Sequence, residues 1–249
     1  GVLHDPIGID RGELLRLAKE RRMISHFDVS KLSPEGYRVL VEDRNVTLPS
    51  GQVITDGFAF RNKAHLLFKA DFFVPCGGRP ESINISNVNE LIKDGDKCNY
   101  KYIVEGANLF ITRQARLELE KHGVILYPDA SANKGGVTSS SLEVLVGLSL
   151  SDDEYISNML FVDGKPTQFY MDYVRDIQTN IARNAHSEFE AIWREHKDTG
   201  KPRSLISTDM SNALNRLSLQ IENTNLFDQE VLRSKILKLV FPETLVNKV

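Results

Sequence analysis

The sequence predicts an α/β protein in which a wound parallel sheet is followed by an all-helical C-terminal region. Three short apolar runs, bounded by Gly or Pro, have the pattern of strands that are covered on both faces, as in a parallel sheet. Beyond residue 150 the apolar residues instead recur every three or four positions, which is typical of amphipathic helices. The three runs are residues 70–74 (ADFFV), 102–104 (YIV) and 124–127 (VILY).

Helical patterns alternate with these runs. Residues 112–122 begin at a Thr suited to capping a helix and are followed by a Gly suited to ending one. Residues 12–24 repeat apolar side chains at helical spacing, and the alternation of strand and helix favours a crossover sheet. Residues 37–54 depart from this rhythm. Apolar residues alternate at Val39 and Val41 and, after a turn, at Val46 and Leu48, and residues 49–51 (PSG) are typical of a turn. We expect an inserted antiparallel hairpin there.

The C-terminal hundred residues are predicted to be entirely helical. The longest helix carries an aromatic stripe that includes Trp193, which we expect to be a core residue. A domain boundary is therefore predicted at residue 150, between a partial dinucleotide-binding domain (1–150) and a helical region (151–249). Three helices are predicted in that region, at residues 167–196, 209–222 and 228–240.

Composition excludes several functional classes. The 249 residues carry 31 Lys and Arg against 34 Asp and Glu, a net charge of −3, and no block of like charge predicts a nucleic-acid or membrane-surface partner. The two cysteines, Cys76 and Cys98, match no metal-binding spacing and fit a reducing compartment, cytoplasmic or mitochondrial. The chain starts at Gly1 with no initiator Met and no signal-like stretch. We therefore expect a piece of a longer, soluble protein.

The segments directly after the three apolar runs are the candidate binding loops. In a doubly wound sheet, ligands bind outside the carboxyl ends of the strands. All three segments are small, contain Gly, and carry a polar side chain suited to a ribose or carboxamide. Each alone could be an ordinary turn, but three in one crossover unit favour a nucleotide site. They are residues 75–78 (PCGG), 105–108 (EGAN) and 128–137 (PDASANKGGV).

Hydroxyl side chains follow the third of these segments. Residues 138–141 (TSSS) precede an apolar run, so they are expected at the start of a helix. The positive end of a helix dipole suits a bound carboxylate or phosphate. A simple N-cap explains the pattern equally well, and both interpretations stay open at this point.

These motifs resemble those of the glutamate dehydrogenases. The resemblance rests on EGAN at 105–108, on PDASANKGGV at 128–137, and on Ser140 followed three residues later by Glu143. Residues 61–83, the hairpin and the helical tail are more similar to the large NAD-specific form found in fungi. The resemblance implies the second half of a doubly wound, Rossmann-like parallel sheet with an inserted hairpin. It also implies a homo-oligomeric enzyme that uses NAD to convert L-glutamate to 2-oxoglutarate and ammonium.

The resemblance also implies residue roles. Cys76 and Gly77 match the residue pair that lies beside the adenosine half of the cofactor in this family. Because the residue types differ here, only contacts through their backbone atoms are implied. Asn108 matches the asparagine beside the nicotinamide-side ribose, and Asn133 the one beside the carboxamide. Two further residues are implied to bind substrate: Val137, which lines the pocket, and Ser140, which donates to the side-chain carboxylate of glutamate.

Other expected elements of such an enzyme are missing from the sequence. There is no G-x-G-x-x-G turn, and the ribose-binding acid, catalytic lysines and catalytic aspartate would precede residue 1. We therefore expect a C-terminal fragment that has no catalytic residue and is inactive alone. No histidine pattern predicts a metal site. One alternative is a leucine- or phenylalanine-type dehydrogenase, although those relatives have an apolar residue at the position of Ser140. The other is a non-catalytic oligomerisation or regulatory module.

Overall fold

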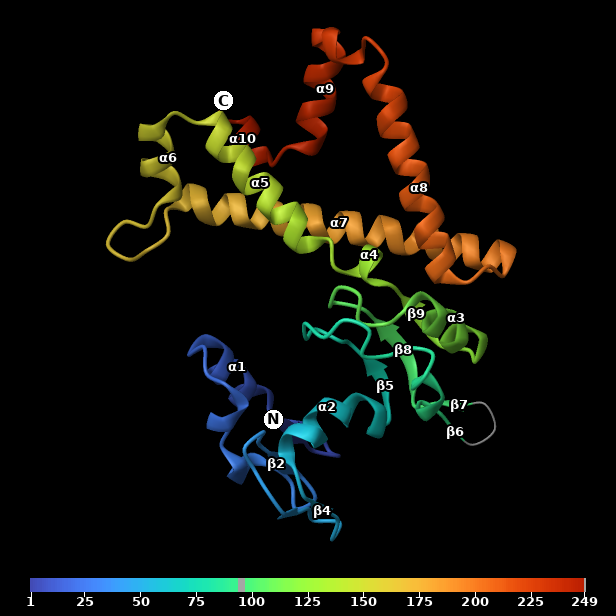
Figure 1. Cartoon of the computed structure of the whole chain (residues 1–249). Coiled ribbons are helices and arrows are strands. Elements are labelled where there is room, and N and C mark those ends of the chain that lie inside the picture. The colour runs from blue at the N-terminus through green and yellow to red at the C-terminus, as the bar shows by residue number, and fades with distance from the viewer. Residues whose placement is uncertain (94–96, 249) are drawn as a thin grey trace. The chain divides into compact units, whose positions relative to one another are not determined.

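The computed structural model describes residues 1–93 and 97–248, and the chain divides into two compact units (Figure 1). The N-terminal unit is Gly1–Lys69 and the C-terminal unit is Ala70–Val249. This division reflects only how compactly each part of the chain is folded, and does not show where functional domains begin and end. The functional boundary expected at residue 150 stays a prediction.

The N-terminal unit contains two small antiparallel sheets. β3 (Val46–Thr47) pairs with β4 (Val53–Ile54), so the predicted hairpin around the PSG turn is confirmed. The prediction is wrong for its first strand, because β2 (Tyr37–Val39) pairs with β1 (Val2–His4) instead. The reason is burial, since the Val39 side chain is fully buried in a core shared with Val2 of the partner strand.

Two helices and two 3-10 turns complete this unit. α1 ends at Lys19, short of the predicted residue 24, because Arg21 adopts a left-handed φ of 52° that a helix cannot continue through. Asp10 caps α1 by accepting a hydrogen bond from the Glu13 N–H at 2.6 Å. The elements are α1 (Arg11–Lys19), η1 (Ile24–His26), η2 (Val29–Lys31) and α2 (Gly57–Leu67).

A parallel sheet forms the base of the C-terminal unit. Its strand order is β5-β8-β9, with Phe72 opposite Tyr102 and Tyr102 opposite Ile125. All three apolar runs are therefore strands, as predicted, and they run parallel. The strands are β5 (Ala70–Phe73), β8 (Tyr100–Val104) and β9 (Ile125–Tyr127); between the first two lie η3 (Val88–Glu90) and the antiparallel pair β6 (Ile92–Lys93) and β7 (Lys97–Cys98).

The two faces of this sheet are covered to different extents within the unit, and the difference is largest at β5. Ile103 and Leu126 are fully buried on the face where α3 (Arg113–Lys121) packs against β9. On the other face Phe72 remains 60% exposed. The expectation of strands covered on both faces is thus wrong for β5, because side chains alternate between the faces of a strand and only one face meets helix α3.

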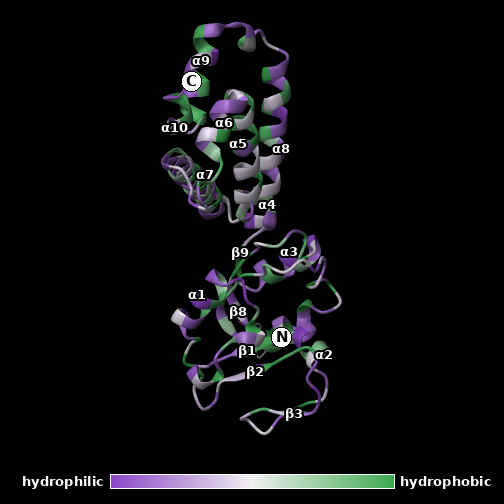
Figure 2. Cartoon of the chain, turned by 90° about the vertical axis from the view of Figure 1, so that its left-hand side faces the viewer, coloured by the Kyte–Doolittle hydropathy of each residue, from purple (hydrophilic) through white to green (hydrophobic). Residues whose placement is uncertain are grey.

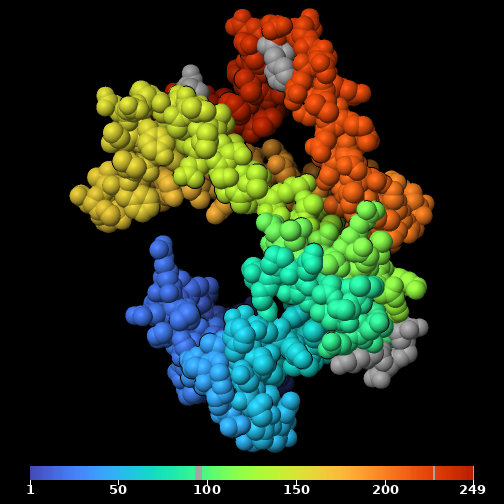
Figure 3. All heavy atoms as spheres, in the orientation of Figure 1, coloured from blue at the N-terminus to red at the C-terminus, as the bar shows by residue number. Residues whose placement is uncertain are grey.

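Beyond residue 150 the regular structure of the unit is helical, as predicted, apart from an isolated bridge between Val162 and Lys165. α7 (Gln168–Thr199) is the predicted long helix, capped by Thr167 and ended by Gly200 at a φ of 69°. Figure 1 shows α8 extending away from α7 and α9 running back toward α10, and Figure 3 shows these two helices in orange and red. The remaining helices are α4 (Asp129–Ala132), α5 (Gly135–Ser149), α6 (Asp152–Met159), α8 (Arg203–Glu222), η4 (Leu226–Asp228), α9 (Glu230–Val240) and α10 (Glu243–Val246).

Apolar and charged residues are interspersed along α8 and α9 (Figure 2). Several of their leucines and valines are well exposed, with Val231 at 72% and Leu239 at 75%. In the part of the chain that the structure describes, none of the helices combines the length and the apolar character needed to span a membrane.

The residue of α7 that is fully buried in the core is not the predicted Trp193 but its neighbour, Ile192. Ile192 is fully buried against Tyr127 and Ile206, whereas Trp193 is only half-buried. The Trp193 ring instead stacks beneath the guanidinium of Arg203, 5.0 Å from its centroid. The helical period explains the difference, because neighbouring positions point about 100° apart, so that Ile192 points into the core while Trp193 packs at its edge.

Truncating these two neighbours should therefore have unequal effects. Ile192→Ala is expected to lower the free energy of unfolding by about 2–5 kcal/mol, as for a buried aliphatic side chain. Trp193→Ala should cost less than the ~3–5 kcal/mol typical of a fully buried aromatic, since part of the ring already faces solvent. Chemical denaturation of both variants measures the order, and a larger loss for Trp193→Ala would place the indole in the core.

Candidate functional site

The carboxyl ends of the three parallel strands lie next to one another. We call the three segments that follow β5, β8 and β9 the first, second and third exits. The Pro75 carbonyl of the first exit accepts a hydrogen bond from the Ala107 N–H of the second at 2.7 Å, which joins the two. The exit from β8 joins β9 in turn, because the Glu105 N–H donates to the Tyr127 carbonyl at 3.0 Å. The three segments predicted to form one binding edge therefore form a continuous edge.

Glycine is needed where the first two exits meet. A Cβ placed on Gly106 would lie 2.9 Å from Cys76 Sγ and 3.3 Å from the Pro75 carbonyl oxygen. At Gly77 a Cβ would meet no atom of the described residues within 4 Å, so the backbone there is open to a ligand. Cys76 itself is exposed.

The structure brings the two predicted asparagines into direct contact. Asn133 Nδ2 donates a hydrogen bond to Asn108 Oδ1, although the residues follow different strands. Within residues 1–93 and 97–248, the Asn108 amide nitrogen and the Asn133 amide oxygen have no other hydrogen-bond partner. The pair thus offers one donor and one acceptor side by side, which is the complement of a carboxamide or of ribose hydroxyls.

A buried charge network lies directly behind this pair. Arg116 of α3 donates from Nε to Glu105 Oε1 at 2.6 Å and from Nη2 to Glu105 Oε2 at 3.0 Å. The same Nη2 donates to Asp129 Oδ1 at 2.8 Å. Glu105 is fully buried, and burial raises the pKa of its carboxyl group although Arg116 opposes the shift.

The two carboxylates of this network also bind backbone of the second exit. Asp129 Oδ2 accepts from the Leu109 N–H at 2.8 Å, and Glu105 Oε2 accepts from the Ile111 N–H at 3.3 Å. Leu109 has a left-handed φ of 57°, a conformation that costs a non-glycine residue energy. The sequence motifs predicted no role for Glu105 or Arg116. The usable signal was an acidic residue directly after a buried strand, which needs a cation nearby.

Helix α5 carries the predicted substrate residues, but it begins earlier than expected. Its first residue is Gly135, so residues 138–141 lie inside the helix and do not cap it. Ser140 Oγ donates to the Val137 carbonyl at 3.0 Å, a bond within the helix. The N-cap interpretation is therefore wrong. Val137 is 71% exposed and Ser140 is also exposed, so both can be reached by a ligand.

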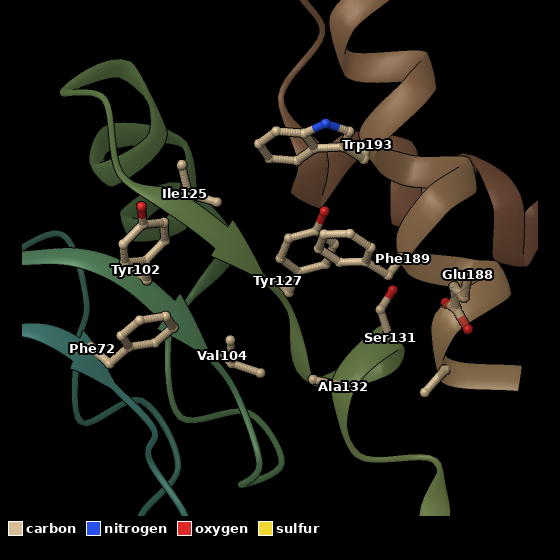
Figure 4. Close-up of a pocket in the computed structure, with 11 residues that line it drawn as sticks. Phe72, Tyr102, Val104, Ile125, Tyr127, Ser131, Ala132, Glu188, Phe189 and Trp193 are labelled. Carbon is tan, nitrogen blue, oxygen red and sulfur yellow. The ribbon is translucent and has the colours of Figure 1, made fainter. Parts of the chain in front are cut away.

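An apolar pocket that the sequence did not predict lies beside the third exit (Figure 4). Its volume is about 470 Å³, and it lies between the open face of the sheet and α7. The rings of Tyr127 and Phe189, which both line it, stack on each other with centroids 5.1 Å apart. Its lining residues are Phe72, Tyr102, Val104, Ile125, Tyr127, Ser131, Ala132, Ala185, Glu188, Phe189 and Trp193.

Comparisons with known proteins agree with the sequence motifs. The profile of the glutamate/leucine/phenylalanine/valine dehydrogenase family matches residues 1–200. Over its whole length the chain is 55% identical to the NAD-specific glutamate dehydrogenase of Neurospora crassa, and 54% identical to a probable NAD-specific glutamate dehydrogenase of Schizosaccharomyces pombe. Glutamate dehydrogenase 2 of Dictyostelium discoideum is 47% identical over 99% of the chain. The chain covers 24%, 23% and 24% of these relatives, about a quarter of their length.

The contact between the first two exits can be tested by adding one methyl group. Gly106→Ala should lower the free energy of unfolding by about 1 kcal/mol, because the new Cβ crowds Cys76 Sγ and the Pro75 carbonyl. Adding Cys76→Ala to this variant removes the sulfur and should recover part of the loss, which a double-mutant cycle measures. Gly78→Ala is the control, since Gly78 lies in the same loop as Cys76, outside any helix, and a Cβ there meets no described atom within 4 Å. Strictly additive effects of Gly106→Ala and Cys76→Ala would contradict the contact.

Proposed function

Because the chain belongs to the glutamate/leucine/phenylalanine/valine dehydrogenase family, we propose that the protein carrying it oxidises L-glutamate to 2-oxoglutarate and ammonium with NAD. The observation that supports this most is the Asn108–Asn133 pair at the carboxyl edge of a parallel sheet. Relatives that match the whole chain, and are called NAD-specific glutamate dehydrogenases, favour NAD and glutamate within the family.

The proposal gives the sheet a specific place in the fold. In it, β5-β8-β9 is the second half of a doubly wound, Rossmann-like sheet. The order of the strands along the chain, their parallel pairing and the crossover through α3 support this assignment. Ligands of such sheets bind at the carboxyl edge, which is where both asparagines lie.

The residues at this edge fit one wall of a dinucleotide site. In this proposal Asn133 binds the nicotinamide carboxamide and Asn108 the adjoining ribose, using the donor and acceptor that their mutual hydrogen bond leaves available. Cys76 and Gly77 line the adenosine half through backbone atoms, and the open space at Gly77 permits close approach. When bound, NAD supplies the acceptor for the hydride of the substrate α-carbon. The residues of this chain orient and hold the cofactor.

The substrate end of the site is assigned to α5. Val137 lines it, and Ser140 donates a hydrogen bond to the distal carboxylate of glutamate. The Ser140 hydroxyl now donates to its own helix, so it reaches a ligand by rotating between staggered χ1 positions. A substrate of the leucine or phenylalanine type has no second carboxylate for this hydroxyl, which is why we prefer glutamate.

We also propose that the intact protein is a homo-oligomer. The exposed apolar side chains of α8 and α9 support a role of this arm in contacts between subunits, because such side chains gain stability when covered. A purely oligomeric or regulatory module would use the same surface. Light scattering together with NAD titration of the full-length protein separates the two, since a module assembles without binding NAD.

The enzymatic proposal is tested with the full-length protein. NAD reduction is followed with glutamate, leucine, phenylalanine and valine as substrates, and kcat/KM is compared between them. A clear preference for glutamate supports the proposal, whereas a preference for an apolar amino acid assigns the protein to another branch of the family. Absence of NAD reduction with every substrate would overturn it.

Ser140→Ala gives the sharpest test of substrate recognition. Losing one charge-assisted hydrogen bond costs about 1.5–3 kcal/mol, so kcat/KM for glutamate should fall roughly 10- to 150-fold. The rate with norvaline should hardly change, because this monocarboxylate makes no such bond. Folding stability should stay level or rise by about 0.5 kcal/mol, since alanine is the better residue inside a helix.

Steady-state kinetics with both substrates, together with a thermal melt, decide the case. Equal losses for glutamate and norvaline would show that Ser140 does not recognise the second carboxylate. Ser139 offers a matched control, because its hydroxyl also donates to its own helix, at the Gly136 carbonyl.

A further inference from the structure

The buried network of Arg116, Glu105 and Asp129 is joined to both asparagines of the proposed cofactor site. We propose that Arg116 is a positioning residue that sets the orientation of Asn108 toward the cofactor and, through the hydrogen bond between the two side chains, that of Asn133. This inference rests on the proposed function for its ligand, NAD, but the geometry on which it depends is that of the chain alone. Arg116 itself lies behind the pair, on α3, and touches neither asparagine in the described contacts.

Asp129 is the point at which the two asparagines are connected. Its side chain accepts from the Leu109 N–H at 2.8 Å and so holds the residue that follows Asn108. Its backbone carbonyl accepts from the Asn133 N–H at 3.0 Å and so holds the second asparagine. A rotation of the Asp129 carboxylate would therefore release the loop that carries Asn108 while Asn133 keeps its backbone anchor.

Arg116 opposes that rotation, together with the Ala130 N–H, which donates to the same Asp129 Oδ1 at 2.8 Å. Arg116 Nη2 donates to Asp129 Oδ1 at 2.8 Å, while Nε and Nη2 also hold both oxygens of Glu105. Glu105 in turn accepts from the Ile111 N–H at 3.3 Å. The loop that carries Asn108 is thus held on its C-terminal side by two carboxylates, and both carboxylates are held by one guanidinium.

The shape of the loop explains why it needs this support. Leu109 has a φ of 57° and is 63% exposed, so its own side chain contributes little packing to hold the left-handed backbone. On the N-terminal side the Ala107 N–H is anchored to the Pro75 carbonyl at 2.7 Å. Asn108 lies between these anchors, and its direction follows from both.

Arginine is required for this geometry, and lysine cannot replace it fully. A planar guanidinium presents several N–H donors in fixed directions and can bind two carboxylates at once. A lysine ammonium keeps the charge beside buried Glu105 but has no planar fork. Arg116→Lys therefore weakens the link to Asp129 but keeps a cation beside Glu105. It is a mild variant and suits the test.

The first measurement is hydrogen–deuterium exchange on the full-length protein without cofactor. In Arg116→Lys, exchange in peptides that cover residues 105–111 should become about tenfold faster, which corresponds to about 1.4 kcal/mol less protection. Asp129→Asn is the second variant, because it leaves the Arg116–Glu105 pair intact and should accelerate exchange in the same peptides. Arg113→Lys is the matched control, since Arg113 is exposed on the same helix.

The second measurement is the kinetic effect. Arg116→Lys and Asp129→Asn should each raise KM for NAD about tenfold, the same free-energy loss expressed in binding, while KM for glutamate changes less than twofold. A purely structural role would lower the melting temperature and the active fraction without this selective change. If the parent protein does not oxidise glutamate, NADH binding followed by fluorescence replaces KM, so failure of the proposed function is recognised separately.

The outcomes are decisive in either direction. Faster exchange together with selectively weaker cofactor binding supports the positioning role. Unchanged exchange in both variants overturns it, and so does faster exchange with unchanged affinity for the cofactor, because the network would then fix a loop that the cofactor does not contact. Arg113→Lys must match the parent in exchange and in KM, and an equal change there would assign the effect to α3 as a whole.

Discussion

The carboxylate of Glu105 is buried at the end of β8, and its need for compensation organises the edge of the sheet around it. A buried carboxylate is costly unless charge and hydrogen bonds replace the water it has lost. Here the compensation comes from Arg116 and from the Ile111 N–H, so helix α3 and the loop after β8 are held in register with the sheet. The same guanidinium binds Asp129 at the start of the next exit. Electrostatic compensation of one side chain thus fixes two neighbouring loops.

The parallel sheet supplies the other half of this arrangement. Parallel strands bring their carboxyl ends to one edge, which is why Asn108 and Asn133 meet although 25 positions separate them. On the face away from α3, the sheet turns aromatic and branched side chains toward α7 and leaves a largely apolar pocket between them. The edge is therefore polar and suited to orient a ligand, while this face is apolar and suited to packing.

The sequence predicted those parts of the fold and of the site that depend on local pattern. The pattern of apolar residues predicted the three strands, and that pattern with its capping residue predicted helix α7. The two asparagines meet because parallel strands bring their carboxyl ends to one edge of the sheet. What it missed depends on distant partners. β2 pairs with β1 across more than 30 residues, and the bridge from Arg116 to two carboxylates exists only once three segments have come together. The start of α5 was misplaced for a local reason, because Gly135 and Gly136 are poor helix formers that the helix nevertheless includes.

The early start of α5 changes how its serines can act. Had the helix begun at residue 138, the hydroxyls would have satisfied orphan backbone N–H groups and been committed to that role. Inside the helix, those N–H groups donate to carbonyls one turn earlier, so Ser140 is free of any capping duty and only the weak bond to Val137 occupies its hydroxyl. A serine in that position contributes little to folding and can be exchanged at little cost to stability. The Ser140 hydroxyl therefore remains available to a ligand on the exposed side of α5, as its proposed role in substrate recognition requires.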